Sequence, residues 1–248
     1  MNIFLCIDDT DQLNGPGTGK LLQALCGQIE SNGWGICGPI SRHQLFVHDD
    51  IPYTSHNSSL CTAILIGENL LDRIIHYSKE FLVTNRAPGS DPGLCVAVND
   101  RLKYAEHLIR FGQQTKASIL SKKDAYQLAD TCQVHLSEHG GTGSGIIGAL
   151  AGVGLRISGQ DGRFRGWYHL GRTGASTRVD TLISHPFIDV VMDENGTALP
   201  PDTPIQFGGD ELKTVLKNHC QVLLVRPAEP HDAEASYVTL TKREVKIY

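Results

Sequence analysis

The stretch IFLCIDDTDQLNGPGTGK, residues 3–20, carries the clearest structural signal in this chain. Its apolar first part, from Ile3 to Ile7, has the length and composition of a buried strand. Three carboxylates follow directly, and a glycine-bearing segment follows them; these residues are Asp8, Asp9, Asp11, Gly15, Gly17, Thr18 and Lys20. A strand that delivers clustered carboxylates to a glycine-rich helix start can hold a metal ion beside a phosphate. The sequence therefore favours nucleotide chemistry.

The length and charge are those of an ordinary enzyme. With 248 residues the chain can bury a sizeable core, and we expect two compact subdomains. Its formal net charge is −5 at pH 7, so the chain as a whole lacks the positive field that attracts a nucleic-acid backbone. A nucleic-acid partner would need a local basic patch.

The cysteines and the apolar runs indicate the compartment. Seven cysteines are widely spaced, with no CxxC pair, which is typical of reduced thiols and not of a disulfide framework or a zinc ribbon. No run approaches the roughly 18 apolar residues that a membrane span needs. We expect a cytoplasmic protein without a membrane partner.

The hydrophobic pattern predicts an α/β (α+β) fold. Strands are expected over 42–48, 60–66 and 93–98, and helices from Thr18, a candidate cap, to about Asn32 and over 70–81, 104–111 and 123–136. Part of this alternation is typical of a ferredoxin-like sandwich. A further helical face starts near Ile146, and short strands are expected over 155–158, 164–170, 187–192, 222–225 and 237–248.

The acidic triplet at Asp8, Asp9 and Asp11 has two interpretations. Its carboxylates could converge on Mg²⁺, which prefers oxygen ligands, or they could form a turn with helix-capping acids. Adjacent carboxylates repel one another unless a positive charge lies between them. This repulsion favours the metal site.

Two glycine-rich segments could bind phosphate. The first, Gly15 to Lys20, lacks the spacing of a P-loop, so a simple capped helix start remains an alternative. The second comprises His139, Gly140, Gly141, Thr142, Gly143, Gly145 and Gly148. It contains a GxGxxG frame, but the preceding residues look helical and no acid follows at dinucleotide-site spacing. A phosphate-binding helix terminus is favoured, with close helix packing as the alternative.

The remaining polar signals are weaker. His139 could hydrogen-bond a phosphate or be structural, and no histidine spacing indicates zinc. The polar segment 49–59 contains three side chains that could orient an acceptor, Tyr53, His56 and Asn57. The basic residues Arg163, Arg165, Arg172 and Arg178 are interleaved with aromatic ones, which suits either nucleic-acid binding or a solvated face.

Four motifs occur in one order: IDDTD at 7–11, IPY at 51–53, DPG at 91–93 and GSGIIGALAGVG at 143–154. Together they resemble those of the tRNA-Ile 2-agmatinylcytidine synthetase family over about residues 1–160. The resemblance implies a kinase-like α/β domain that uses ATP and Mg²⁺, with a ferredoxin-like α+β subdomain. It implies that Asp8, Asp9 and Asp11 place Mg²⁺, that Thr18 is the phosphorylated threonine of that family, and that Gly143, Gly145 and Gly148 belong to its second glycine loop.

The resemblance also implies a domain division. Residues 1–48 and 118–180 would form the kinase-like domain, 49–117 the ferredoxin-like subdomain, and 181–248 a β-rich segment packed on the core. We expect the family's OB-fold and zinc ribbon to be lacking, because the ribbon's cysteine pairs are absent. The cation before the family's glycine run is replaced by Ser144.

The predicted function is Mg²⁺- and ATP-dependent phosphoryl transfer or phosphate-activated ligation. Its acceptor would be a small molecule or nucleoside, or a tRNA delivered by a partner. Two alternatives remain open. One is a non-catalytic nucleotide-binding module, and the other is tRNA cytidine modification with a separate RNA-binding subunit.

Overall fold

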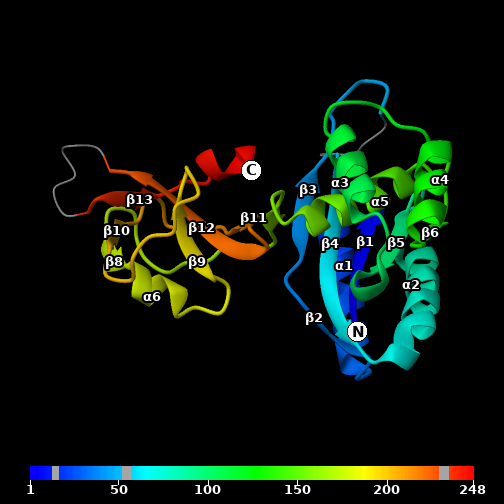
Figure 1. Ribbon diagram of the computed structural model, residues 1–248, viewed down its shortest axis with the longest axis horizontal. Coiled ribbons are helices and arrows are strands. Elements are labelled where there is room, and N and C mark those ends of the chain that lie inside the picture. Colours follow the sequence, from blue (N-terminus) through cyan, green and yellow to red (C-terminus); the bar gives the residue numbers. More distant parts are fainter. Residues whose placement is uncertain (13–16, 52–56, 229–234) are drawn as a thin grey trace. The chain divides into compact units, whose positions relative to one another are not determined.

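The structure, a computed structural model, describes residues 1–12, 17–51, 57–228 and 235–248. Its contacts group into two compact units, Met1–Ser158 and Gly159–Tyr248 (Figure 1). The combination of strands and helices confirms the predicted α/β class. The finer division into kinase-like, ferredoxin-like and C-terminal parts stays a prediction.

An antiparallel sheet forms the centre of the first unit. Its strands lie in the order β6-β5-β1-β4-β3, and β2 also pairs with β4. They span Asn2–Asp8 (β1), Gly35–Cys37 (β2), Ser41–Gln44 (β3), Ser58–Ile66 (β4), Gly93–Val98 (β5) and His135–Glu138 (β6). Because β1 runs antiparallel to both β4 and β5, its carboxyl end lies beside the amino ends of its two neighbours.

Helices cover both faces of this sheet, as Figure 1 shows. The odd-numbered residues of β1, from Ile3 to Ile7, pack with α1 (Thr18–Ser31) and α2 (Leu71–Asn85). Cys6 packs with the opposite layer, which comprises α3 (Ala105–Gln114), α4 (Lys122–Cys132) and α5 (Gly145–Ser158). Side chains alternate along a strand, so Asp8 shares the α5 face with Cys6.

The glycines of α5 let this helix lie directly on its neighbours. A Cβ atom built on Gly152 would lie 3.2 Å from Ser59 Cβ and closer still to Cys6 Sγ. One built on Gly154 would lie 2.5 Å from the carbonyl carbon of Leu108 in α3. Neither position has room for a side chain. The glycine-rich helix is therefore a packing element as well as a loop-bearing one.

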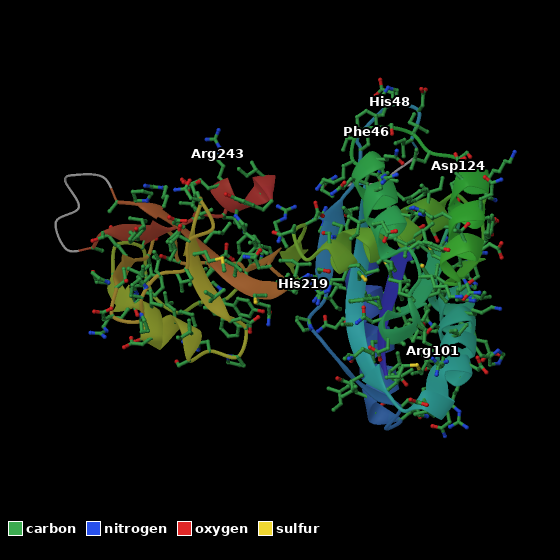
Figure 2. The ribbon with its side chains drawn as sticks, viewed as in Figure 1. Phe46, His48, Arg101, Asp124, His219 and Arg243 are labelled. Atoms are coloured by element: carbon green, nitrogen blue, oxygen red, sulfur yellow. The ribbon has the colours of Figure 1, made fainter. Side chains whose placement is uncertain are left out.

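The second unit consists mainly of short strands. They span Arg163–Phe164 (β7), Ser176–Arg178 (β8), Val190–Asp193 (β9), Pro204–Gln206 (β10), Val215–Lys217 (β11), Cys220–Pro227 (β12) and Tyr237–Thr239 (β13). Strands β11 and β12 form a hairpin whose turn residues, Asn218 and His219, both have positive φ (51° and 62°). This suits the right-handed twist of a two-residue hairpin; His219 is labelled in Figure 2. Helix α6 (Val179–Ile183) completes the unit's core.

Several predicted elements differ from the observed ones. The helix predicted over 123–136 ends at Cys132, because Gln133 adopts a left-handed conformation, and the chain continues as β6. Residues 155–158 belong to α5 and not to a strand. The strand predicted over 42–48 ends at Gln44. Of the strand predicted over 164–170, only Phe164 is in a strand, β7 (Arg163–Phe164). Of the strand predicted over 237–248, only Tyr237–Thr239 is in a strand, β13. A short 3₁₀ helix, η3 (Glu244–Ile247), ends the chain; two others, η1 (Glu68–Leu70) and η2 (Asn99–Arg101), lie in the first unit.

Candidate functional site

Strand β1 ends in carboxylates whose protonation is strongly perturbed. Burial, followed by the charge of Asp9, raises the pKa of Asp8 to about 8. Burial and the charges of Asp91 and Asp11 raise the pKa of Asp9 to about 6. Asp9 also has a left-handed backbone, with φ 48°. Burial and repulsion thus disfavour the ionised form of these carboxylates, and a cation bound beside them would stabilise it.

Helix α5 leaves a gap for Asp8. A Cβ atom built on Gly148 would lie 2.6 Å from Asp8 Cγ, and closer still to Asp8 Oδ2. The Asp8 carboxylate therefore occupies the space that a side chain at position 148 would need. The acidic motif and the second glycine motif, both predicted from sequence, meet at this contact.

A third element, the segment before β5, joins the two motifs. The backbone amide of Asp91 donates to the carbonyl of Asp9 at 3.0 Å. The Asp91 carboxylate accepts from the amide of Gly143, from the amide of Ser144 at 2.9 Å, and from the hydroxyl of Thr142. Asp91 thus fixes the segment that leads into α5. Sequence reasoning noticed it only within the DPG motif; the signal for its role was an acid directly before a strand-opening Pro-Gly.

Because Asp91 takes the amides of positions 143 and 144, other amides of the loop stay available. Within the described ranges, the amides of Gly140, Gly141 and Thr142 donate to no acceptor. The φ angles of Gly140 and Gly141 are 146° and 59°, which residues with a Cβ rarely adopt. Unpaired backbone amides beside a helix start are possible donors to an anion.

A guanidinium group lies against the same loop. A Cβ atom built on Gly140 would lie 2.5 Å from Arg86 Cζ, so the Arg86 side chain occupies the space beside this glycine. Arg86 Nη1 also donates to the carbonyl of Ser90 at 3.2 Å. The loop therefore combines amide donors with a positive charge. Sequence reasoning did not identify Arg86.

The outer side of the loop is braced by α4. Lys122 Nζ lies 2.7 Å from Glu138 Oε1 and donates to the carbonyl of Thr142 at 2.7 Å. The hydroxyl of Tyr126 donates to the same Glu138 oxygen at 2.7 Å. Gly143 lacks a side chain at the place where the Glu138 carboxylate lies. These contacts fix the loop without using the amides of positions 140–142.

The first glycine segment lies beside Asp11. A Cβ atom built on Gly17 would lie 3.6 Å from Asp11 Oδ2. Thr18 is buried and is the first residue of α1, whereas the N-cap is Gly17 and no side chain caps the helix, so the expected Thr18 cap is absent. Lys20 is exposed. Gly15 lies outside the described residues.

The remaining candidate residues lie apart from this arrangement or outside the described residues. Asn57 Nδ2 donates to the carbonyl of Phe46 at 2.6 Å, so its carboxamide ties together the ends of β3 and β4. Phe46 and His48 are labelled in Figure 2, and the Phe46 amide donates to Thr115 at the end of α3. Tyr53 and His56 lie outside the described residues.

His139 is nearly buried, and its Nε2 lies 2.8 Å from Ser137 Oγ. Burial, followed by the charge of Lys79, lowers the pKa of His139 to about 4, so its ring is neutral at pH 7. In the second unit, the Nζ atoms of Lys213 and Lys242 lie 4.2 and 4.8 Å from the Trp167 ring centre. Phe164 from the same basic-aromatic segment is buried.

The acidic strand end alone does not make a complete metal site. Over residues 1–12, 17–51, 57–228 and 235–248, no group of three or more His, Cys, Asp or Glu side chains is arranged to hold a metal ion. Mg²⁺ commonly binds through one or two carboxylates, with water and substrate phosphates completing its shell. The acidic strand end fits that kind of site. No helix in the described part of the chain is long and apolar enough to cross a membrane.

Comparison with known proteins supports a fold relationship. No family model matches the chain, and no curated protein matches it. Among solved structures, a tRNA fluorescent labeling enzyme aligns with 22% identity and a TM-score of 0.53, covering 62% of this chain and 36% of that one. Apo TiaS, an agmatidine synthetase that acts on an isoleucine tRNA, aligns with 20% identity and a TM-score of 0.54, covering 62% and 35%.

The complex of TiaS with its tRNA and ATP aligns with 19% identity and a TM-score of 0.55, covering 82% of this chain and 50% of that one. The chain thus spans about a third to a half of the length of these structures. At this level of identity the similarity establishes a shared fold. The mixed α/β architecture of this protein is similar to that of TiaS.

Proposed function

We propose that this protein binds ATP with Mg²⁺ and uses the terminal phosphate to phosphorylate or activate an acceptor. The observation that carries the proposal is the contact between Asp8 and Gly148, which brings a buried acidic strand end to the helix that carries the amide-lined loop. Acids and free amides on neighbouring elements have complementary uses: the acids suit a cation and the amides suit phosphate oxygens. The fold shared with TiaS, a protein crystallised with ATP and tRNA, supports the same assignment.

The acidic residues fit a divalent cation on chemical grounds. The raised pKa values of Asp8 and Asp9 reflect burial first and then repulsion by neighbouring carboxylates, both of which a bound cation offsets. We assign this role to one or two of the carboxylates of Asp8, Asp9 and Asp11, with Asp8 held in place by the Gly148 gap. When bound, Mg²⁺ would neutralise charge on the phosphate oxygens.

The phosphates would lie against the second glycine loop. Amides of Gly140, Gly141 and Thr142 would donate to phosphate oxygens, and the Arg86 guanidinium would balance their charge. Asp91 would act as a positioning residue, because it orders the start of α5 without occupying those three amides. Gly17, Lys20 and Thr18 at the start of α1 would approach from the Asp11 side. Thr18 is the proposed site of phosphorylation within the chain.

The acceptor is a small molecule, a nucleoside or a tRNA. The solved TiaS complexes with tRNA, ATP or an ATP analogue, and agmatine favour a nucleoside within RNA as the first candidate to test. The chain's net charge of −5 favours a tRNA delivered by a partner protein over one bound by this chain alone. A module that binds the nucleotide without transferring phosphate is the competing assignment.

Calorimetric titration of the full chain with ATP and Mg²⁺ tests the site. Asp8→Asn should abolish Mg²⁺-dependent ATP binding, and the matched control Asp124→Asn, at an exposed acid on α4 (Figure 2), should leave it unchanged. Equal binding by both variants would remove Asp8 from the site. Mass spectrometry after incubation with labelled ATP then separates a transferase, which yields a phosphorylated acceptor or Thr18, from a binding module, which yields neither.

A further inference from the structure

Strand β6 and the residue that follows it place three hydrogen-bonding side chains in a row. Side chains alternate along a strand, so His135, Ser137 and His139 lie on the face opposite Glu138, which pairs with Lys122 on α4. Ser137 Oγ lies 2.9 Å from Nε2 of His135 and 2.8 Å from Nε2 of His139. The hydroxyl therefore bridges the two imidazole rings.

This bridge restricts the protonation of both rings. A serine hydroxyl has one proton, so when both rings are neutral it donates to one Nε2 and accepts from the Nε2–H of the other. The two histidines must then be opposite tautomers. If one ring moves its proton from one nitrogen to the other, the Ser137 hydroxyl must turn and the other ring must change tautomer as well.

The surroundings keep both rings neutral. Burial and the charge of Lys79 on α2 lower the pKa of His135 and of His139. The charge of His135 lowers the pKa of His139 further. The row joins a partly exposed ring, His135, to a nearly buried ring, His139, that directly precedes the amide-lined loop in the chain.

We propose that His135, Ser137 and His139 form a proton relay between solvent and the loop at Gly140–Thr142. The proposal rests on the proposed function, because phosphoryl transfer to a hydroxyl or attack by an amine releases a proton. His139 Nδ1 takes up that proton while its Nε2 proton moves to Ser137 Oγ. The Ser137 proton moves to His135 Nε2, and His135 Nδ1 releases its proton to solvent. One proton enters, one leaves, and the row ends in the opposite orientation.

Nitrogen NMR of the full chain tests the row without requiring any activity. In the unmodified protein, Nε2 should be protonated in one ring and unprotonated in the other, and acidification that protonates His135 should change the tautomer of His139. In Ser137→Ala the His139 signal should no longer respond to His135. In Ser137→Thr, which keeps the hydroxyl, the response should persist. Identical tautomers in both rings, or a response that survives in Ser137→Ala, would overturn the relay.

Turnover provides the second readout. If the chain transfers phosphate, Ser137→Ala should lower kcat on the order of 10²-fold, the lower range for lost acid–base assistance, with KM for ATP unchanged and with recovery in Ser137→Thr. An unchanged kcat in Ser137→Ala would refute the relay while leaving the ATP site intact. Absence of ATP binding by the unmodified protein would refute the proposed function, and the NMR result would then decide whether the coupled row exists.

Discussion

Replacing Gly148 with alanine tests the contact that joins the two halves of the candidate site. The new Cβ atom would lie 2.6 Å from Asp8 Cγ and 3.1 Å from Leu45 Cδ1, and the buried Asp8 side chain cannot turn into solvent. Overpacking of this kind typically costs about 1–3 kcal/mol. Alanine also gains about 1 kcal/mol over glycine in a helix interior, which partly hides the loss.

Gly27→Ala in α1 is the matched control. A Cβ atom at Gly27 meets nothing within 4 Å, so this variant should show only the helix gain of roughly 0.5–1 kcal/mol. The free energy of unfolding of Gly148→Ala should therefore lie about 1–3 kcal/mol below that of Gly27→Ala. Urea unfolding followed by Trp34 fluorescence, in a Trp167→Phe background, reports on the first unit alone.

A double-mutant cycle identifies the clashing partner. In an Asp8→Ala background the carboxylate is gone, so the penalty of Gly148→Ala should shrink, with a coupling energy of about 1 kcal/mol or more. The reasoning fails if Gly148→Ala is as stable as Gly27→Ala. It fails equally if the penalty is unchanged when Asp8 is alanine.

Three further predictions concern charge and capping. Since the folded-state pKa of Asp8 is raised to about 8, the native state holds a proton that the unfolded chain has lost, so without divalent cations stability should fall as pH rises from 6.5 to 8, by at most about 1.4 kcal/mol per unit. Asp8→Asn should flatten this dependence of stability on pH. The pKa of His139, lowered to about 4, makes stability rise with pH, but only below about pH 6.5. A wild-type stability that does not change between pH 6.5 and 8 would contradict the burial of Asp8. Asp91→Ala should lower the free energy of unfolding by about 1–3 kcal/mol, because two amides and a hydroxyl lose their acceptor. Hydrogen exchange at the amides of Gly143 and Ser144 should accelerate, and unchanged exchange there would argue against these bonds. Ser121→Ala should cost about 1 kcal/mol through loss of its capping box with Asp124, as measured by thermal unfolding, with an effect near zero as the contrary result.

Local patterns predicted many elements of the first unit. Residues 93–98 were expected as a strand and are β5, and the helical spacing over 70–81 falls within α2 apart from its first residue. The errors have physical causes. Residues 155–158 are apolar because α5 is buried on nearly all sides, and such a segment has no periodicity that separates helix from strand. The end of α4 depends on the left-handed Gln133, a residue type that seldom marks a helix end.

Some residues of the candidate site could be identified from the sequence, and others only from the structure. The residue types of the acidic strand end and of the second glycine segment could be identified from the sequence because their chemistry is local. Arg86 could not, because a lone arginine carries no such signal until another element approaches it. The DPG motif singled out Asp91, but its role depends on the amides of positions 143 and 144, which only the fold brings to it. His135 and Ser137 became informative only once β6 was known to be a strand, which places them beside His139.

The amino-acid sequence by itself determined that the segments of β1, β4 and β5 are strands and that α1 and α2 are helices, and it determined the supply of carboxylates and glycines near their ends. Only the tertiary structure decided which of these groups meet. Antiparallel pairing of β1 with β5 brings Asp91 to Asp9, and the packing of α5 on β1 sets Gly148 against Asp8. These contacts join residues far apart in the chain, so they depend on strand order and close packing and not on any local propensity.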